Sequence, residues 1–254
     1  MMIYTNIFEY DIKSAHPIIL TKLNYPFKDD WYKLEDKLDR NIYIGKLFRD
    51  DLPLRIKVNS YVESIIFDFM YETNNIKNVI MVLYDALFCK QYIEEDIIKF
   101  YQQKNGILIR LKNKFDLFII INKRARKFVG FNKVKCVLKG FTRTKGIEEF
   151  LYRNLYQEIL NGKPLGLILE TLQGNFINSN DINLFILEKN DKEFIVTNNK
   201  EVEYQNQNIY EIDKLYYLNN IIKPIIDSIV IYTFQSQFNS LFLKEGKYEK
   251  KNIN

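Results

Sequence analysis

The amino-acid sequence predicts an α+β protein in which helices pack on a mixed or antiparallel sheet, and three features support this class. Short apolar runs rich in β-branched residues, such as 79–83 and 115–122, are typical of strands. Apolar side chains from Leu54 to Met70 fall on one helical stripe, which predicts a core-facing helix. With 47% hydrophobic and 27% charged residues among 254, the chain can bury a sizeable core.

In its first half the chain is predicted to form a strand, four helices and a hairpin. In order these are a strand over 3–12, a helix beginning between 14 and 17, helices over 29–41 and 54–70, a hairpin over 78–89 and a helix over 92–103. Ser14 is a residue type that caps helices, and Pro17 suits a first helical turn. The hairpin is expected to turn at Tyr84-Asp85-Ala86.

The second half is predicted to continue with strands and to end in helices. Four strands are expected at 107–111, 115–122, 127–131 and 134–138, followed by helices over 144–160 and 215–234. Glu148 lies near the start of the first of these helices, where the helix dipole favours a carboxylate. The Lys-rich tail, 244–254, is expected to fray.

Basic residues are concentrated in one segment. The net charge is only +5, but residues 104–147 contain thirteen Lys and Arg against one acidic residue, Asp116, and so carry +12. The rest of the chain therefore carries −7. Because these charges alternate with apolar residues in strand-like stretches, several are expected on one sheet face, where they would suit a phosphate backbone.

Several chemistries are excluded by the residues that are missing. Two cysteines, Cys89 and Cys136, cannot form a disulfide framework or a four-ligand zinc site unaided. One histidine, His16, leaves no room for a His-ligated metal cluster, and the sequence contains neither common phosphate-binding glycine motif. No signal peptide is visible, and no run approaches 18 apolar residues, so a cytoplasmic location without a membrane partner is expected.

Two aspartates occur beside buried β-structure. Asp11 is near the end of an apolar strand, and Asp85 is in the turn between two apolar stretches. A carboxylate is costly so close to a core unless it is paired or binds a cation. Two such carboxylates on neighbouring strands predict a two-metal site for phosphoryl transfer, and we expect them to lie close together in the fold.

Three segments resemble the catalytic motifs of B-family DNA polymerases, in the order of that family. Residues 10–17, Tyr-Asp-Ile-Lys-Ser-Ala-His-Pro, resemble the first motif, Asp-x-x-Ser-Leu-Tyr-Pro. Residues 55–61, Arg-Ile-Lys-Val-Asn-Ser-Tyr, are similar to the fingers-helix motif, a Lys four residues before Asn-Ser. Residues 83–88, Leu-Tyr-Asp-Ala-Leu-Phe, resemble the third motif, Asp-Thr-Asp-Ser.

Two further segments extend the resemblance downstream, so that it spans about residues 8–231. Lys127-Phe128 with 135–140 is similar to the basic signature of the family, and 212–218 with 223–225 to its thumb element. The resemblance implies a polymerase palm at 1–20 and 62–143, short helical fingers at 21–61, and a mainly helical thumb with the C-terminal tail at 144–254. It begins at the first catalytic motif, so an exonuclease or other N-terminal function is expected from a separate subunit.

The same resemblance implies roles for individual residues. Asp11 and Asp85 would be catalytic and, with the carbonyl of Ile12, would hold two Mg²⁺ ions, for which Mn²⁺ could substitute. The residues implied in nucleotide binding are Ser14, His16, Arg55, Lys57 and Asn59. Those implied in nucleic-acid binding are Lys127, Lys133, Lys135, Lys139 and Arg143. The partners would be a DNA primer–template and deoxynucleoside triphosphates.

The sequence departs from the family pattern at several motif positions. Leu83 replaces the first Asp of the third motif, His16 the sugar-stacking Tyr, and Arg55 the Lys that contacts the triphosphate. Three functions therefore stay open. The leading one is a template-directed DNA polymerase without proofreading exonuclease. The others are a catalytically degenerate palm that binds nucleic acid or acts as a polymerase accessory subunit, and a primer- or template-independent nucleotidyltransferase.

Overall fold

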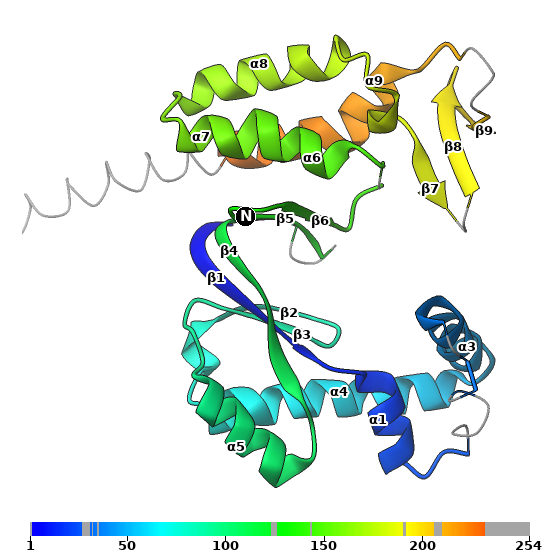
Figure 1. The fold of residues 1–254 in the computed structure, drawn as a ribbon, viewed down its shortest axis with the longest axis vertical. Helices are drawn as coiled ribbons and strands as arrows, with labels where there is room; N and C mark the ends of the chain where they lie inside the picture. Colours follow the sequence, from blue (N-terminus) through cyan, green and yellow to red (C-terminus); the bar gives the residue numbers. More distant parts are fainter. Residues whose placement is uncertain are drawn as a thin grey trace, which may run out of the picture. The chain divides into compact units, whose positions relative to one another are not determined.

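The protein has the α+β architecture that its sequence predicts, with helices, a six-stranded sheet and a three-stranded sheet (Figure 1). The computed structural model describes residues 2–26, 31, 33–34, 36–122, 126–142, 144–189, 192–205 and 210–231. The chain divides into two compact units, one of residues 6–114 and one of residues 1–5 with 115–254. No helix among the described residues is both long and apolar enough to cross a membrane.

The unit of residues 6–114 contains the first four strands and the helices that cover them. The strands are β1 (Met2–Ile12), β2 (Val79–Leu83), β3 (Ala86–Cys89) and β4 (Ile109–Asn122), hydrogen-bonded in the order β2-β3-β1-β4. The helices are α1 (Ala15–Lys22), α3 (Lys37–Asp50), α4 (Leu52–Glu72), the 3-10 turn η1 (Ile76–Asn78) and α5 (Glu95–Asn105). Strands β1 and β4 are long enough to contribute to both units.

Helix α4 confirms the predicted apolar stripe. The Asp51 side chain caps it by accepting a 2.8 Å hydrogen bond from the Leu54 amide, which satisfies one of the free donors of the first turn. The stripe that runs from Leu54 to Phe69 is buried. It forms the core of this unit together with residues from β1, β3, α1 and α5. The site described below is therefore built on a packed scaffold.

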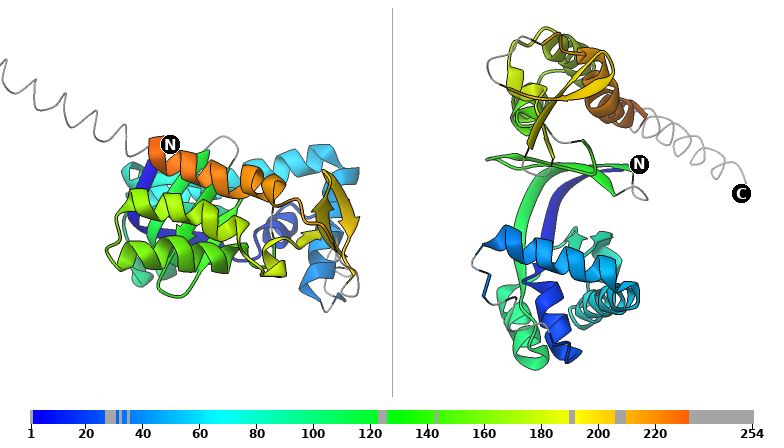
Figure 2. Two further views of the ribbon diagram at one scale, coloured as in Figure 1. Left: turned by 90° about the horizontal axis from the view of Figure 1, so that it is seen from above. Right: turned by 90° about the vertical axis from the view of Figure 1, so that its right-hand side faces the viewer.

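The second unit combines the far end of β4 with the rest of the chain. Its elements are β5 (Lys127–Phe131), β6 (Cys136–Lys139), α6 (Ile147–Leu151), the π-helical segment η2 (Tyr152–Gln157), α7 (Glu158–Leu160), α8 (Leu165–Ile177), η3 (Ile182–Leu184), β7 (Leu187–Lys189), β8 (Lys192–Thr197), β9 (Lys200–Glu203), α9 (Lys214–Tyr217), η4 (Leu218–Ile222) and a helix over 223–231. The run from α6 to α7 packs beside α8, which also contacts η4 (Figure 2). Apolar residues of β5, β6 and these helices share one core.

The unit boundary falls inside β4, whereas the sequence places the start of the thumb at residue 144. The reason is that β5 and β6 bury Val129, Phe131 and Leu138 against the C-terminal helices rather than against the core of residues 6–114. The assignment of palm, fingers and thumb therefore remains an interpretation of the sequence.

Some predicted elements differ from those observed. Ser14 makes no side-chain capping bond, since it adopts left-handed backbone angles (φ 54°), and α1 begins at Ala15. The strands predicted at 107–111 and 115–122 form the single strand β4. The polar residues that separate the two predicted strands stay in the strand, because Lys112 and Asn113 contact Glu9 of β1. Of the helix predicted over 29–41, residues 37–41 belong to α3, and residues 29, 30, 32 and 35 lie outside the described residues.

The second half of the chain differs in similar ways. The helix predicted over 144–160 begins at Ile147 and passes through η2. The last strand of the predicted set, 134–138, is observed as β6, Cys136–Lys139. The predicted end of the last helix at 234 and the tail at 244–254 lie outside the described residues.

Gly130 in β5 provides a test of packing in the second unit. A Cβ at this position would lie 2.6 Å from two ring carbons of Phe115, which is fully buried. We expect Gly130→Ala to lower the free energy of unfolding by about 1–3 kcal/mol, because the ring has no free volume to move into. Thermal or urea unfolding monitored by circular dichroism measures this.

The matched control for that change is Gly174→Ala in α8. A Cβ at Gly174 meets nothing within 4 Å, and Ala favours a helix over Gly by about 1 kcal/mol, so this variant should be unchanged or more stable. Equal stability of the two variants would contradict the packing at Gly130.

Candidate active site

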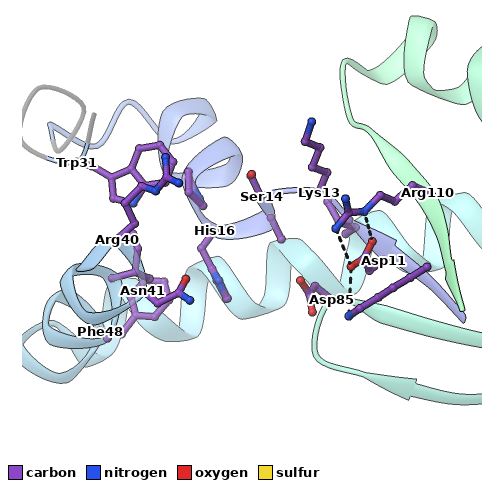
Figure 3. Close-up of a pocket in the computed structure, with 16 residues that line it drawn as sticks. Asp11, Lys13, Ser14, His16, Trp31, Arg40, Asn41, Phe48, Asp85 and Arg110 are labelled. Atoms are coloured by element: carbon purple, nitrogen blue, oxygen red, sulfur yellow. Dashed lines mark hydrogen bonds and ion pairs between the residues drawn. The ribbon is translucent and has the colours of Figure 1, made fainter. Parts of the chain in front are cut away.

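The two aspartates singled out by the sequence lie at adjacent positions of the sheet. Asp11 pairs with Ala86 in the antiparallel register of β1 and β3, one residue from the β2–β3 turn that holds Asp85. The Ile12 amide donates a 3.1 Å hydrogen bond to the carbonyl oxygen of Asp85. Both aspartates line one cavity of about 810 Å³ (Figure 3). The hairpin thus brings together two residues that are 74 positions apart.

The turn residue beside Asp85 helps to shape this arrangement. Tyr84 has left-handed backbone angles (φ 54°), so β2 reverses into β3 over two residues. Asp85 is half-buried in this turn, while Asp11 is buried, with 6% of its surface exposed. A buried carboxylate requires compensation by a cation or by hydrogen-bond donors.

Asp11 obtains this compensation from two cations of β4. Arg110 Nε lies 2.9 Å from Asp11 Oδ1, and its Nη2 3.5 Å from Oδ2. Lys112 Nζ lies 3.3 Å from Asp11 Oδ2 and 3.3 Å from Glu9 Oε1. The hydrogen bond to Asp11 raises the pKa of Arg110. Burial acts to lower the pKa of Lys112, but Glu9 and Asp11 together raise it, so both side chains are cationic.

The opposite wall of the cavity comes from α1 and α3. From α3, the residues Arg40, Asn41, Ile44, Gly45 and Phe48 face the cavity, and Trp31 adjoins them. The guanidinium carbon of Arg40 lies 5.4 Å from the centre of the Trp31 ring, a cation–π distance that orients Arg40. The cavity therefore carries two carboxylates with the cations Arg110 and Lys112 on the side of the sheet, and a cation and an amide on α3 (Figure 3).

His16 lies between these walls. Its ring packs edge-on against Phe48, with 5.3 Å between ring centres. Burial lowers the pKa of His16 below its usual value, and Asp85 acts in the opposite direction with a smaller effect. His16 is therefore neutral at pH 7, and it presents a small ring rather than a charge to a ligand in the cavity.

The predicted nucleotide-binding residues fall into two groups. Ser14 and His16 line the cavity, as do the predicted metal ligands Asp11, Ile12 and Asp85. Arg55, Lys57 and Asn59 are exposed on α4 and are absent from the lining of this cavity. In their place α3 supplies Arg40 and Asn41. The sequence feature that indicates these α3 residues is the helical spacing of Asn41, Gly45 and Phe48 downstream of Trp31, which lies outside the fingers motif.

The donor set of the cavity fits Mg²⁺. Asp11 and Asp85 offer carboxylate oxygens and Ile12 a main-chain carbonyl, and Mg²⁺ is commonly held by one or two carboxylates completed by water and substrate phosphates. The described residues contain no group of three or more His, Cys, Asp or Glu arranged to hold a metal without such help. A cation here would therefore depend on its substrate for ligands, and it would have to replace Arg110 at Asp11.

The predicted nucleic-acid-binding lysines belong to the other unit. Lys133, Lys135 and Lys139 are exposed. Lys139 lies on β6 opposite the buried face of Cys136 and Leu138, and Lys133 and Lys135 lie in the turn of residues 132–135 that leads into β6. Lys127 lies with its Nζ 5.1 Å from the centre of the Phe141 ring. Gly140 (φ 79°) packs directly on Lys127. Arg143 lies outside the described residues.

Several cations of the basic segment of residues 104–147 are paired with acidic residues. Lys104 pairs with Glu72 at 3.0 Å, and Lys145 pairs with Glu193. Arg110 and Lys112 pair with Asp11 and Glu9 as described. These charges neutralise acidic residues that are distant in sequence, so the charge available to a polyanion is lower than +12.

Comparison with known proteins gives structural likenesses but no match by sequence. No family model matches the sequence, and no curated protein matches it. Among solved structures, the chain is similar to the family B DNA polymerase from the hyperthermophilic archaeon Pyrobaculum calidifontis, with a TM-score of 0.42 and 11% sequence identity. The match covers 89% of this chain and 45% of that polymerase, so the chain spans less than half of its length. A likeness of this strength leaves the function to be argued from the residues themselves.

Proposed function

We propose that this protein is a nucleotidyltransferase that extends a DNA primer on a template with deoxynucleoside triphosphates, without a proofreading exonuclease. The observation that carries the proposal is the meeting of Asp11, Ile12 and Asp85 at one cavity, opposite Arg40 and Asn41 of α3. Oxygen ligands on one wall and phosphate-binding groups on the other are what phosphoryl transfer requires.

Eight of the sixteen lining residues have a role in this scheme. Asp11, Asp85 and the Ile12 carbonyl would hold two Mg²⁺ ions, which when bound activate the primer hydroxyl and neutralise the triphosphate. Arg40, oriented by Trp31, would bind phosphate oxygens through its planar fork, and Asn41 would donate a hydrogen bond to the nucleotide. His16 and Phe48 would pack against the sugar. Catalysis then depends on position and charge, because phosphoryl transfer needs little covalent help.

The exposed lysines of the second unit would bind the primer–template. Lys135 and Lys139 flank the buried residues Cys136 and Leu138, and Lys133 is exposed in the turn before β6, so all three can contact phosphates without disturbing the core. Such contacts hold a duplex in register without reading its sequence. We therefore propose that the protein binds duplex DNA without sequence preference.

The direct test of this function is primer extension by the purified chain with Mg²⁺ and each class of nucleotide. Template-dependent addition of deoxynucleotides is expected. Addition without a template would favour the nucleotidyltransferase alternative, and a lack of any addition under Mg²⁺ and Mn²⁺ would overturn the enzymatic proposal.

One observation favours a second candidate function, a degenerate palm that binds nucleic acid without catalysis. Asp11 is already neutralised by Arg110 and Lys112, an arrangement that needs no metal. In such a protein, DNA binding would not require a divalent cation, and Mg²⁺ would act only as a competing counterion of the phosphates. Binding would persist in EDTA, and primer extension would be absent.

The size of the His16 side chain predicts weak sugar discrimination. Imidazole is smaller than the phenol that the B-family motif has at this position, so a 2′-hydroxyl should be admitted more easily. We expect His16→Tyr to raise the preference for deoxynucleotides over ribonucleotides by up to about a hundredfold. The ratio of kcat/KM for the two nucleotides measures it. If the unaltered protein already excludes ribonucleotides as strongly as the variant, His16 does not act on the sugar.

A further inference from the structure

Four side chains of β1 and β4 form a continuous ion-pair network, and three of them, Asp11, Arg110 and Lys112, line the cavity. Glu9 and Asp11 are two positions apart on β1, and Arg110 and Lys112 are two apart on β4, so each pair shares one face of its strand. Both carboxylates are buried, at 5% and 6% exposure. The side chains of Arg110 and Lys112 are 54% and 45% exposed. The cations are thus the accessible members of the network.

The two cations are held differently. Lys112 bridges Asp11 and Glu9, and Glu9 also accepts a 2.6 Å hydrogen bond from Asn113 Nδ2. Arg110 contacts Asp11, and no second carboxylate pairs with it within the part of the chain that the structure describes. If both cations left Asp11, Lys112 would still be paired with Glu9, whereas Arg110 would have no carboxylate partner and would face the solvent in the cavity that it lines.

We propose that Arg110 is an exchangeable counter-ion of Asp11, which occupies the carboxylate until a divalent cation displaces it. This inference rests on the proposed function, since it assigns a metal to Asp11. Arg110 reaches both carboxylate oxygens, so it competes for the same lone pairs as the metal. Lys112, anchored on Glu9, is a positioning residue that keeps the Asp11 carboxylate aimed at the cavity.

Two consequences follow from the exchange. The affinity of the empty site for a metal is reduced by the strength of the ion pair with Arg110. A ligand that attracts the freed guanidinium, such as a triphosphate, favours the state in which Asp11 is open to the metal. By reciprocity the metal then favours binding of the triphosphate, so the two ligands bind cooperatively.

The test measures binding of Mn²⁺ alone to the full chain, from the electron paramagnetic resonance signal of free Mn²⁺. We expect Arg110→Gln to bind Mn²⁺ about tenfold more tightly than the unaltered protein, within the range usual for coupled sites. Arg110→Lys keeps the charge and should stay near the unaltered affinity. Asp11→Asn should remove the site.

Lys104→Gln is the matched control. Lys104 lies in the same unit, its side chain is also 54% exposed, and it pairs with Glu72 away from the cavity. Lys104→Gln removes the same charge as Arg110→Gln, so an increase in Mn²⁺ affinity that comes from net charge alone would appear in both variants. A tighter affinity in Arg110→Gln but not in Lys104→Gln supports the exchange.

The outcomes separate this inference from the proposed function. If Mn²⁺ binding depends on Asp11 but Arg110→Gln matches Lys104→Gln, the exchange is wrong and the metal site stands. If neither the unaltered protein nor Arg110→Gln shows Mn²⁺ binding that depends on Asp11, the exchange is wrong, and primer extension with Mg²⁺ then decides the proposed function separately. A second measurement uses the unaltered chain, so its result does not depend on whether the Arg110→Gln variant folds. The ¹⁵Nε signal of Arg110, assigned by its loss in Arg110→Lys, should shift on addition of Mg²⁺, and a signal that does not move overturns the exchange.

Discussion

Asp85→Asn is expected to reduce nucleotide incorporation by at least about a hundredfold while leaving binding of primer–template unchanged or tighter. Metal-ion catalysis supplies several kcal/mol of stabilisation to the transition state, and each 1.4 kcal/mol or so is tenfold in rate. Asn keeps the size of the side chain but loses the charge that holds a divalent cation. Loss of one negative charge can only help a polyanion to bind. Single-nucleotide incorporation and fluorescence anisotropy of labelled DNA measure the two effects.

Asp96→Asn is the control for this change. Asp96 lies on α5 in the same unit, its side chain is 93% exposed, and it is absent from the cavity lining. Asp96→Asn removes the same charge as Asp85→Asn but outside the cavity, so this variant should leave incorporation unchanged. Incorporation by Asp85→Asn at the rate of this control would exclude a catalytic role for Asp85 and would favour the non-catalytic palm.

Reversal of two lysines in the second unit is expected to have the next largest effect. Lys135→Glu combined with Lys139→Glu should weaken binding of primer–template by at least about tenfold, and equally for different DNA sequences, because phosphate contacts carry no sequence information. The plot of log affinity against log salt should lose about 0.9 of slope for each contact. Titrations between low and moderate salt with two unrelated duplexes measure both quantities.

The corresponding control reverses Lys200 and Lys223 to Glu. Both residues are exposed in the same unit and lie outside the basic segment, so they test whether net charge alone accounts for the effect. A loss of affinity in the control equal to that in the Lys135 and Lys139 variant would mean that β6 is not the contact surface. A flat salt dependence in the unaltered protein would mean that its lysines are only solvated.

Much of the fold was predictable because the local pattern and the packing agree. The stripe along α4 follows from apolar spacing, and the turn at Tyr84-Asp85 from an aspartate between two apolar runs, and the structure confirms both. β4 was predicted as two strands because its polar middle, around Lys112 and Asn113, reads as a break in the absence of its partner strand. The contacts of Lys112 and Asn113 with Glu9 in the folded protein show why β4 continues through this polar stretch.

The candidate site was predictable only in part, for a related reason. A motif comparison locates residues along the chain but does not decide which face of a helix meets a cavity. It therefore pointed to Arg55 and Asn59 on α4, whereas Arg40 and Asn41 of α3 line the cavity. The order of α3 and α4 in the chain does not decide between them, and the helical spacing of Asn41, Gly45 and Phe48 marks one face of α3 without showing what that face meets.

The sequence alone determined the α+β class and the candidate pair Asp11 and Asp85, since apolar periodicity and acidic residues beside buried strands can be recognised locally. The tertiary structure decided that the pair faces α3 and that Arg110 and Lys112 neutralise Asp11. Those ion pairs join residues about a hundred positions apart, through the placement of β4 beside β1. The sequence does not show which group a charged side chain contacts, because a lysine or arginine is the same residue whether it contacts a phosphate or a buried carboxylate.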